Sequence, residues 1–323
     1  MNTKNQRIAD FQALVAANHG NITDAFTKAW ESVGSVGEVP RLREFLSGAN
    51  KGVHLLNHEL PKHFVSRGFE LKFAAILVHA KPIVIPLENL KTGAIKTGLP
   101  ANPELGDLNV VFLFLDRAKN VKMARSILYQ AKTVRKSLSQ AIQDPHQIYL
   151  YDKAQGYKYR DGPYAGEVRQ LPIAGQRRKG LHYLFVSENP VACSASPADR
   201  PAYSNWSESM FRLLMDAEGI GIAAGQARGS GWSKINEDLV HIFKHDAKLR
   251  ASNLSELASW FNSFKDPNHW FEEASKEAKG INTMFVIIRD QKLPAGDEEV
   301  PEPPKLVRRE YIPPFETMRT SSY

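Results

Sequence analysis

Apolar side chains recur along this chain with two periods, which separate helical from strand-forming stretches. In residues 5–33 they recur at steps of three and four residues, which predicts helix with one apolar stripe. Glycine and proline interrupt the pattern, and residues 41–60 predict a further helix that ends at Pro61. We expect this helical region, residues 1–62, to cover one face of the structure that follows.

Strand-forming stretches begin after this region. Residues 69–86 are rich in Ile, Val and Phe, and predict one strand or two short strands around Lys81-Pro82. Two further strands are predicted at about 105–115 and 124–131, joined by a short charged turn. Their adjacency along the chain predicts that they pair with each other.

The remaining chain alternates helical and strand patterns. Residues 133–143 have helical spacing, and Asp144-Pro145 is expected to stop that helix. The other predicted elements are short strands at 147–151 and 181–186, helices at 204–217, 233–250 and 254–264, and a final apolar strand at 281–290. This order predicts an α+β or α/β fold with a mixed central sheet flanked by helices.

Four segments follow from these patterns. They are the helical region 1–62, an α/β core at 63–190, a mixed and mainly helical region at 191–293 packed on that core, and a tail at 294–323. The tail is rich in proline and carries an acidic run, so we expect it to be extended and weakly structured.

Composition narrows the class of protein. Of the 323 residues, 42% are hydrophobic, which is enough for a sizeable core, and Lys plus Arg exceed Asp plus Glu by seven. An excess of basic residues attracts polyanions, above all nucleic acid.

The single cysteine, Cys193, excludes an internal disulfide framework and a cysteine-rich zinc site. Without an apolar run of transmembrane length or a signal-peptide pattern, we expect no membrane partner and a cytoplasmic location.

The strand pair carries the most informative polar residues. Glu104 and Asp107 precede the first strand, and Gln130 and Lys132 lie near the end of the second. Residues two apart on a strand point to one face, so Gln130 and Lys132 can converge on one group. Carboxylate and amide oxygens are ligands that Mg²⁺ accepts, and a lysine can hold or activate a water, which together suit phosphodiester cleavage.

This pattern resembles the PD-(D/E)xK, or restriction-endonuclease-like, superfamily, in the variants with Gln in place of the second acid. The likeness covers residues 69–151 and rests on Gly106-Asp107 and Gln130-Ala131-Lys132. It implies a restriction-endonuclease-like core in which Asp107 and Gln130 bind Mg²⁺ or Mn²⁺. It further implies that Lys132 assists the attacking water and that Glu104 is a further ligand or a supporting group.

The resemblance therefore implies a metal-dependent nuclease, with DNA as the expected substrate and RNA as the alternative. A genome-defence (antiviral) or mobile-element setting fits it. Basic residues on loops, namely Arg177, Arg178, Lys179 and Arg228, are candidate contacts to the nucleic-acid backbone. The same residues are also typical of solvated loops.

Two other classes of protein fit the same sequence. One is a non-catalytic nucleic-acid-binding regulator, which would keep the basic surface without depending on Asp107. The other is an interaction subunit of a larger complex, in which the tail docks a protein partner. A homodimer is a further expected arrangement, because many nucleases of this kind pair to cut both strands.

Overall fold

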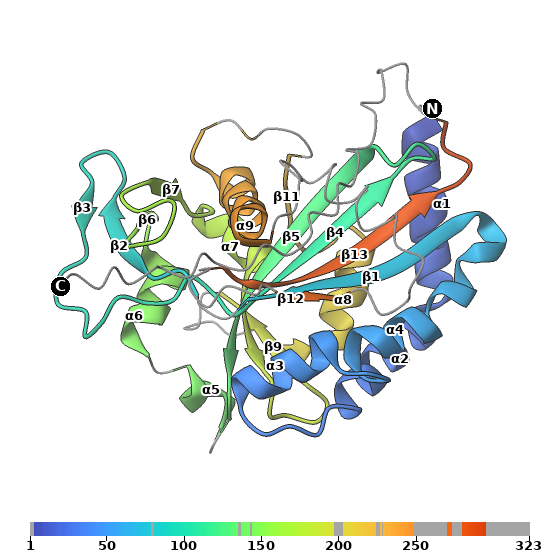
Figure 1. Ribbon diagram of the computed structural model, residues 1–323, viewed down its shortest axis with the longest axis horizontal. Coiled ribbons are helices and arrows are strands. Elements are labelled where there is room, and N and C mark those ends of the chain that lie inside the picture. The colour runs from blue at the N-terminus through green and yellow to red at the C-terminus, as the bar shows by residue number, and fades with distance from the viewer. Residues whose placement is uncertain are drawn as a thin grey trace, which may run out of the picture.

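The computed structural model describes residues 3–78, 81–134, 137–142, 144–196, 203–223, 227, 229–247, 270–272 and 280–294. Within these residues, a mixed sheet of nine strands crosses the molecule (Figure 1). In spatial order its strands are β10 (Tyr203–Asn205), β9 (Ala192–Ala195), β8 (Leu181–Phe185), β5 (Val121–Lys132), β4 (Leu108–Leu115), β13 (Asn282–Asp290), β1 (Phe69–Leu77) and β12 (Trp270–Glu272), with β11 (Ile220–Gly221) beside β5.

The pairing at the centre of the sheet sets the position of every strand end. β4 and β5 are antiparallel neighbours, with Leu108 opposite Tyr129. On its other side β4 runs parallel to β13, and β5 runs parallel to β8. The start of β4 therefore lies beside the end of β5, at one end of the central strands.

Helices cover one face of this sheet, with α2, α3 and α4 below it and α1 at the right in Figure 1. They are α1 (Thr3–Ala17), α2 (His19–Glu31), α3 (Glu38–Ser47), α4 (Gly52–Glu59) and α8 (Trp206–Leu214), with the 3-10 turns η1 (Pro61–His63) and η2 (Val65–Arg67) leading into β1. Phe11 of α1 is fully buried and packs within 6.2 Å, between ring centroids, of four other phenylalanines on this face. Aromatic clusters of this kind bury large apolar areas, so they anchor α1 to the sheet.

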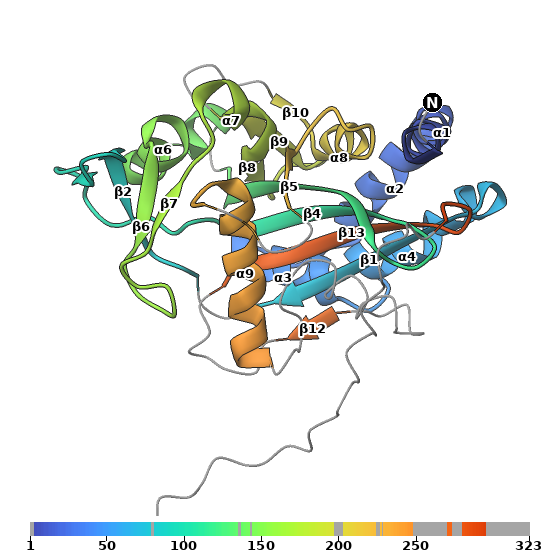
Figure 2. The same ribbon diagram turned by 90° about the horizontal axis from the view of Figure 1, so that it is seen from above.

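A smaller sheet and further helices cover the opposite face. The sheet has the order β3 (Ala94–Ile95), β2 (Val84–Asn89), β6 (Gly156–Tyr159) and β7 (Val168–Gln170). The helices are α5 (Leu138–Ala141), α6 (Pro145–Ile148), the π-helical turn η3 (Tyr149–Lys153), α7 (Ala174–Gly180) and α9 (Trp232–Ala247). Figure 2 shows α9 crossing the central strands next to β6 and β7.

Most predicted elements are confirmed. The helices expected near 5–33, 41–60, 204–217 and 233–250 and the strands expected at 105–115, 124–131, 181–186 and 281–290 are all present with shifted ends. The mixed central sheet flanked by helices is therefore the observed fold class. The predicted helix at 254–264 and nearly all of the tail, residues 295–323, lie outside the described residues.

Two local predictions are wrong. Of the described residues in the helix expected at 133–143, only Leu138–Ala141 are helical, and Thr133 and Val134 instead donate their backbone N–H groups to the side chains of Glu38 at 2.7 Å and Ser187 at 2.8 Å. The strand expected at 147–151 is helical instead, as α6 and η3. Pro145 stands at the first turn of α6, where its fixed φ favours a helical start.

The segment expected to pack on the core also completes the sheet. β13, from residues 282–290, lies between β1 and β4 rather than outside them. Within the described residues, no helix has both the length and the apolar character needed to cross a membrane.

Candidate active site

The predicted polar residues meet at one end of the central strands. Asp107 directly precedes β4, and its backbone N–H donates to the carbonyl of Tyr129 on β5 at 2.8 Å. Gln130 and Lys132 are among the last residues of β5 and point to the same face, because strand side chains alternate. The antiparallel pairing thus brings Asp107 and Gln130 into contact, and Lys132 lies on the same face of β5 as Gln130.

The Asp107 carboxylate lies at the centre of the cluster and is only 1% exposed. Its Oδ2 accepts hydrogen bonds from the backbone N–H of Ala131 at 2.7 Å and from Nε2 of Gln130. Its Oδ1 accepts from the ammonium of Lys81. Burial raises the pKa of Asp107, while the nearby Lys81 charge opposes that rise.

The Gln130 side chain has one unused acceptor. Its Nε2 is bonded to Asp107, but its Oε1 is buried and has no hydrogen-bond partner. A buried amide oxygen without a donor costs free energy, about 1–3 kcal/mol. An orphaned oxygen next to a carboxylate is therefore the atom of this cluster best placed to accept a cation or a donor from a ligand.

Lys81 was missed by the sequence analysis, although it is the cation closest to Asp107. Besides Asp107, its Nζ contacts Glu104 at 2.8 Å, and the Glu104 side chain is 38% exposed. Burial disfavours the charge on Lys81, but the two carboxylates outweigh burial and raise the pKa of Lys81. The ammonium therefore stays charged and joins the two acids.

Backbone pairing explains how Lys81 reaches this position. Leu105 donates its N–H to the carbonyl of Pro82 at 2.9 Å, and Val84 donates to the carbonyl of Pro103 at 3.0 Å. This short ladder lays the segment before β2 against the segment before β4. More than twenty residues separate Lys81 from its partners, so no local spacing in the sequence could reveal the contact.

Lys132 points toward the outer side of the cluster. Its ammonium donates to Asp144 at 2.9 Å and to Oε1 of Gln147 in α6. The hydrogen bond from Lys132 lowers the pKa of Asp144, whose side chain is half exposed. Asp144 and Gln147 were also missed by the sequence analysis, because Asp144-Pro145 was interpreted only as a helix stop.

Gly106 lies between Glu104 and Asp107, where the chain packs closely against neighbouring side chains. A Cβ at this position would lie 2.8 Å from Cδ1 of Leu128 and 3.1 Å from the hydroxyl of Tyr151. That hydroxyl donates to the carbonyl of Leu105 at 3.1 Å. Tyr151 of η3 thus holds the segment that carries Glu104 and Asp107 against β5, and a larger residue than glycine would push it away.

These residues can be tested for their fit to a hard divalent cation. Asp107, Glu104 and Oε1 of Gln130 supply oxygen atoms, the ligand type that Mg²⁺ prefers, and Mg²⁺ keeps several waters. In the part of the chain that the structure describes, no group of three or more His, Cys, Asp or Glu side chains is arranged to hold a metal. The donor set therefore fits Mg²⁺ or Mn²⁺ only with water or substrate oxygens added and with the Lys81 ammonium displaced.

The predicted nucleic-acid contacts lie in different environments. Arg178 and Lys179 are exposed on α7, whereas Arg228 lies outside the described residues. The guanidinium of Arg177 is buried and donates to the backbone carbonyls of Pro172, Tyr151 and Ala154. Arg177 therefore supports η3 and does not suit the surface contact predicted for it.

Comparison with known proteins adds no further constraint on the site. Searches of family models, of curated proteins and of solved structures find no match to this chain. The functional argument therefore depends on the residues and the geometry described above.

Proposed function

We propose that this protein is a metal-dependent nuclease that hydrolyses phosphodiester bonds in nucleic acid, with DNA as the first substrate to test. One observation carries the proposal. Asp107 and Gln130 are in contact at one end of the sheet, Lys132 lies on the same face of β5 as Gln130, and the buried Oε1 of Gln130 has no hydrogen-bond partner. This is the arrangement that the resemblance to PD-(D/E)xK nucleases implies.

Each residue then has a role. Asp107, Glu104 and Oε1 of Gln130 would hold Mg²⁺ or Mn²⁺. When bound, the ion would neutralise charge on the scissile phosphate and make a bound water more nucleophilic. Lys132 would hold the attacking water or stabilise the charge that develops on the phosphate. The contacts from Asp144 and Gln147 orient the Lys132 ammonium.

Lys81 would control access to the two acids. Its ammonium already neutralises Asp107 and Glu104, so it competes with an incoming cation for the same carboxylates. Displaced by the ion, Lys81 would become a free cation at the site and suit a phosphate oxygen. On this proposal, the fully paired arrangement is the resting form of the site.

The ion pairs of Lys81 and Lys132 also favour a second function. Lys81 and Lys132 both have carboxylate partners, and Asp107 and Gln130 are nearly fully buried. A structural polar cluster would have these properties, and the protein would then be a non-catalytic nucleic-acid-binding regulator. Metal dependence distinguishes the two functions, because only the nuclease requires Mg²⁺ or Mn²⁺ for its reaction.

Cleavage of labelled plasmid, linear duplex and single-stranded substrates, in Mg²⁺, Mn²⁺ or EDTA, tests the proposal. We expect cutting that EDTA abolishes and that Lys132→Met lowers by roughly 10²- to 10⁴-fold, the usual contribution of a positioned proton-transfer group. Lys122→Met is the matched control. Lys122 lies on the same strand and pairs with the buried Asp116 at 3.2 Å, toward the opposite end of β5.

Two outcomes would count against the nuclease. Cutting that survives EDTA, or that Lys132→Met and Lys122→Met affect equally, would separate the activity from this cluster. No cutting of any substrate, together with nucleic-acid binding that is unchanged in both variants, would favour the non-catalytic regulator.

A further inference from the structure

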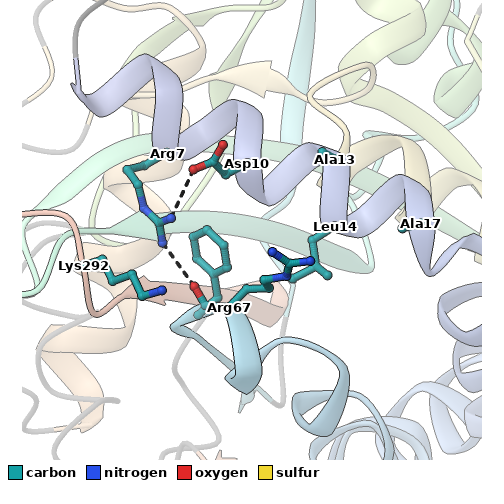
Figure 3. A pocket seen from close by; sticks show the side chains of 8 residues that line it. Arg7, Asp10, Ala13, Leu14, Ala17, Arg67 and Lys292 are labelled. Atoms are coloured by element: carbon teal, nitrogen blue, oxygen red, sulfur yellow. Dashed lines mark hydrogen bonds and ion pairs between the residues drawn. The ribbon is translucent and has the colours of Figure 1, made fainter.

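A second candidate site lies at the opposite end of the central strands. A cavity of about 370 Å³ opens between α1 and the start of β1, far along the strands from Asp107 (Figure 3). Its lining residues come from three parts of the chain that meet here: Arg7, Asp10, Ala13, Leu14 and Ala17 of α1, then Arg67 and Phe69, and finally Lys292 after β13. Nothing in the proposed nuclease chemistry uses this cavity.

The positive and negative side chains around the cavity are not all paired with one another. Arg7 donates to both oxygens of the buried Asp290 at 2.7 Å and to Asp10 at 3.2 Å, so its charge is compensated. These carboxylates raise the pKa of Arg7, against the effect of its burial. Arg67 and Lys292 are exposed, and within the described residues neither side chain has a hydrogen-bond or ion-pair partner. Arg67 and Lys292 are therefore two unpaired cations at the cavity, and together with Arg7, Asp10 and Asp290 they leave a net charge of +1.

Contacts of the neighbouring backbone position Lys292 and Arg67 at the cavity. Lys292 donates its backbone N–H to Asp290 at 2.9 Å, and Gly68 leaves room for its side-chain stem: a Cβ on Gly68 would lie 2.9 Å from Cε of Lys292. The carbonyl of Arg67 accepts from Arg7 at 3.4 Å. Both chain segments are thus tied to the Arg7–Asp290 pair at the base of the cavity.

The rest of the lining is apolar. Ala13 and Ala17 are exposed along α1, and Leu14 is half-buried between them, so these three side chains form the apolar wall. Phe69 is only 1% exposed, with its ring under the Arg7 guanidinium at 4.5 Å, and it supports the wall from beneath. Figure 3 shows Arg7 and Lys292 on one side of the cavity and Arg67 near Leu14. A ligand here meets a cationic rim and an apolar wall at the same time.

We propose that this cavity binds a small organic dianion, a phosphate monoester attached to an aromatic or apolar group, of which a nucleoside monophosphate is one kind. Two unpaired cations suit a group with two negative charges, and an arginine can bind phosphate through two parallel hydrogen bonds. The small side chains of α1 leave room for a ring, and the volume lies in the range of small-molecule sites. This inference is independent of the proposed nuclease.

Titration calorimetry of the full chain with AMP and with phenyl phosphate tests the proposal. Adenosine and inorganic phosphate are the comparison ligands. We expect both phosphate monoesters to bind at least tenfold more tightly than either comparison ligand, because only they use the cations and the apolar wall together.

Three variants identify the location. The double variant Arg67→Glu/Lys292→Glu is expected to weaken binding of the monoesters by at least tenfold. Lys28→Glu/Lys91→Glu changes the net charge equally at exposed lysines elsewhere and should leave binding unchanged. Ala13→Trp fills the apolar wall at an exposed helix position and should weaken the monoesters by at least tenfold without affecting inorganic phosphate.

Several results would overturn the proposal. They are the absence of saturable binding by both monoesters, equal affinity for AMP and inorganic phosphate, or equal losses in the two charge-reversal variants. Binding of a 5′-phosphorylated oligonucleotide without binding of AMP would also overturn it, because the cavity would then be part of a nucleic-acid surface.

Discussion

Lys81 determines how the candidate active site can work. Its ammonium contacts both Asp107 and Glu104, the only two carboxylates that we assign to the ion. A divalent cation bound to the same oxygens would lie close to this positive charge, and like charges a few ångströms apart repel by several kcal/mol in a partly buried site. Metal binding and the Lys81 contacts therefore exclude each other.

Removing the Lys81 charge should strengthen metal binding. We expect Lys81→Met to lower the Mg²⁺ concentration for half-maximal cutting by about tenfold or more, because the competing cation is gone. The assay is best run at pH 8.5. Loss of Lys81 leaves burial unopposed, which raises the pKa of Asp107 further, and only the ionised carboxylate binds metal.

The control for this variant is Lys96→Met. Lys96 pairs with Glu88 at 2.7 Å on the second sheet and should have no effect on Mg²⁺ dependence. An unchanged or increased Mg²⁺ requirement in Lys81→Met would show that Lys81 does not compete with the ion, and the proposed role of Lys81 would be wrong.

The residues of the site differ in how far the sequence could predict them. Asp107 directly precedes β4 and Gln130 lies on β5, the next strand along the chain, so their contact follows from one antiparallel pairing. Lys81 and Gln147 reach the cluster through the ladder before β2 and through the helical turn of α6. These contacts depend on tertiary packing, which spacing along the chain does not reveal.

At the scale of elements, strand pairing prevailed over local helical spacing. Residues 133–143 have a helical pattern, yet β5 runs straight up to Lys132 because β8 supplies a parallel partner as far as Phe185. The helix then begins only at Leu138, where the Ser137 side chain accepts from the N–H of Gln140 and caps it. Before it, Thr133 and Val134 donate their backbone N–H groups to the side chains of Glu38 and Ser187.

The pairing of β5 with β8 also buries a titratable side chain. His182 of β8 is 2% exposed, and its Nε2 donates to the carbonyl of Arg178 at 2.8 Å. Its Nδ1 is buried without a partner. Burial lowers the pKa of His182 below its ordinary value, so the folded protein holds this imidazole neutral.

The stability of the fold should therefore decrease in mild acid. Below about pH 6.5, His182 binds a proton in the unfolded chain but not in the folded protein. The contribution of this difference to the free energy of unfolding is therefore fully present above this pH and is lost as the pH falls. Between pH 7.5 and pH 5.5 we expect His182 to contribute a loss in the free energy of unfolding of up to about 1.4 kcal/mol, the limit for a group that binds no proton in the folded state, measured by urea denaturation.

A comparison of variants isolates this contribution. His182→Gln stays neutral and keeps a donor for the carbonyl of Arg178, so its loss between the two pH values should be smaller than that of wild type by this amount. His58→Gln alters an exposed histidine and should retain the wild-type loss. Equal losses in wild type and His182→Gln would contradict the account.

At the scale of the whole molecule, the chain returns to its centre near the end of the described residues. β13 enters between β1 and β4, more than 150 residues after β4. An apolar strand was predicted at 281–290, but nothing local to it reveals which neighbours it pairs with, because strand pairing is set by the whole sheet. The sequence could therefore predict a mixed sheet but not the order of its strands.

This central position gives the sheet two different ends. Asp107 precedes β4, beside Gln130, Lys81 and an unsatisfied amide oxygen. Asp116 follows β4 and is equally buried, but Asn120 and Lys122 satisfy both of its oxygens around a tight turn. On our proposal the first of these buried carboxylates binds the ion, whereas the second stabilises a turn.

Comparison of these two carboxylates is the most direct test of the account. Asp107→Asn and Asp116→Asn each remove one buried negative charge, at opposite ends of β4, so both should cost stability to a similar degree. We predict that metal-dependent cleavage is lost in Asp107→Asn and retained in Asp116→Asn, with both proteins folded by circular dichroism. Equal cleavage by the two variants would contradict the assignment of the site to Asp107.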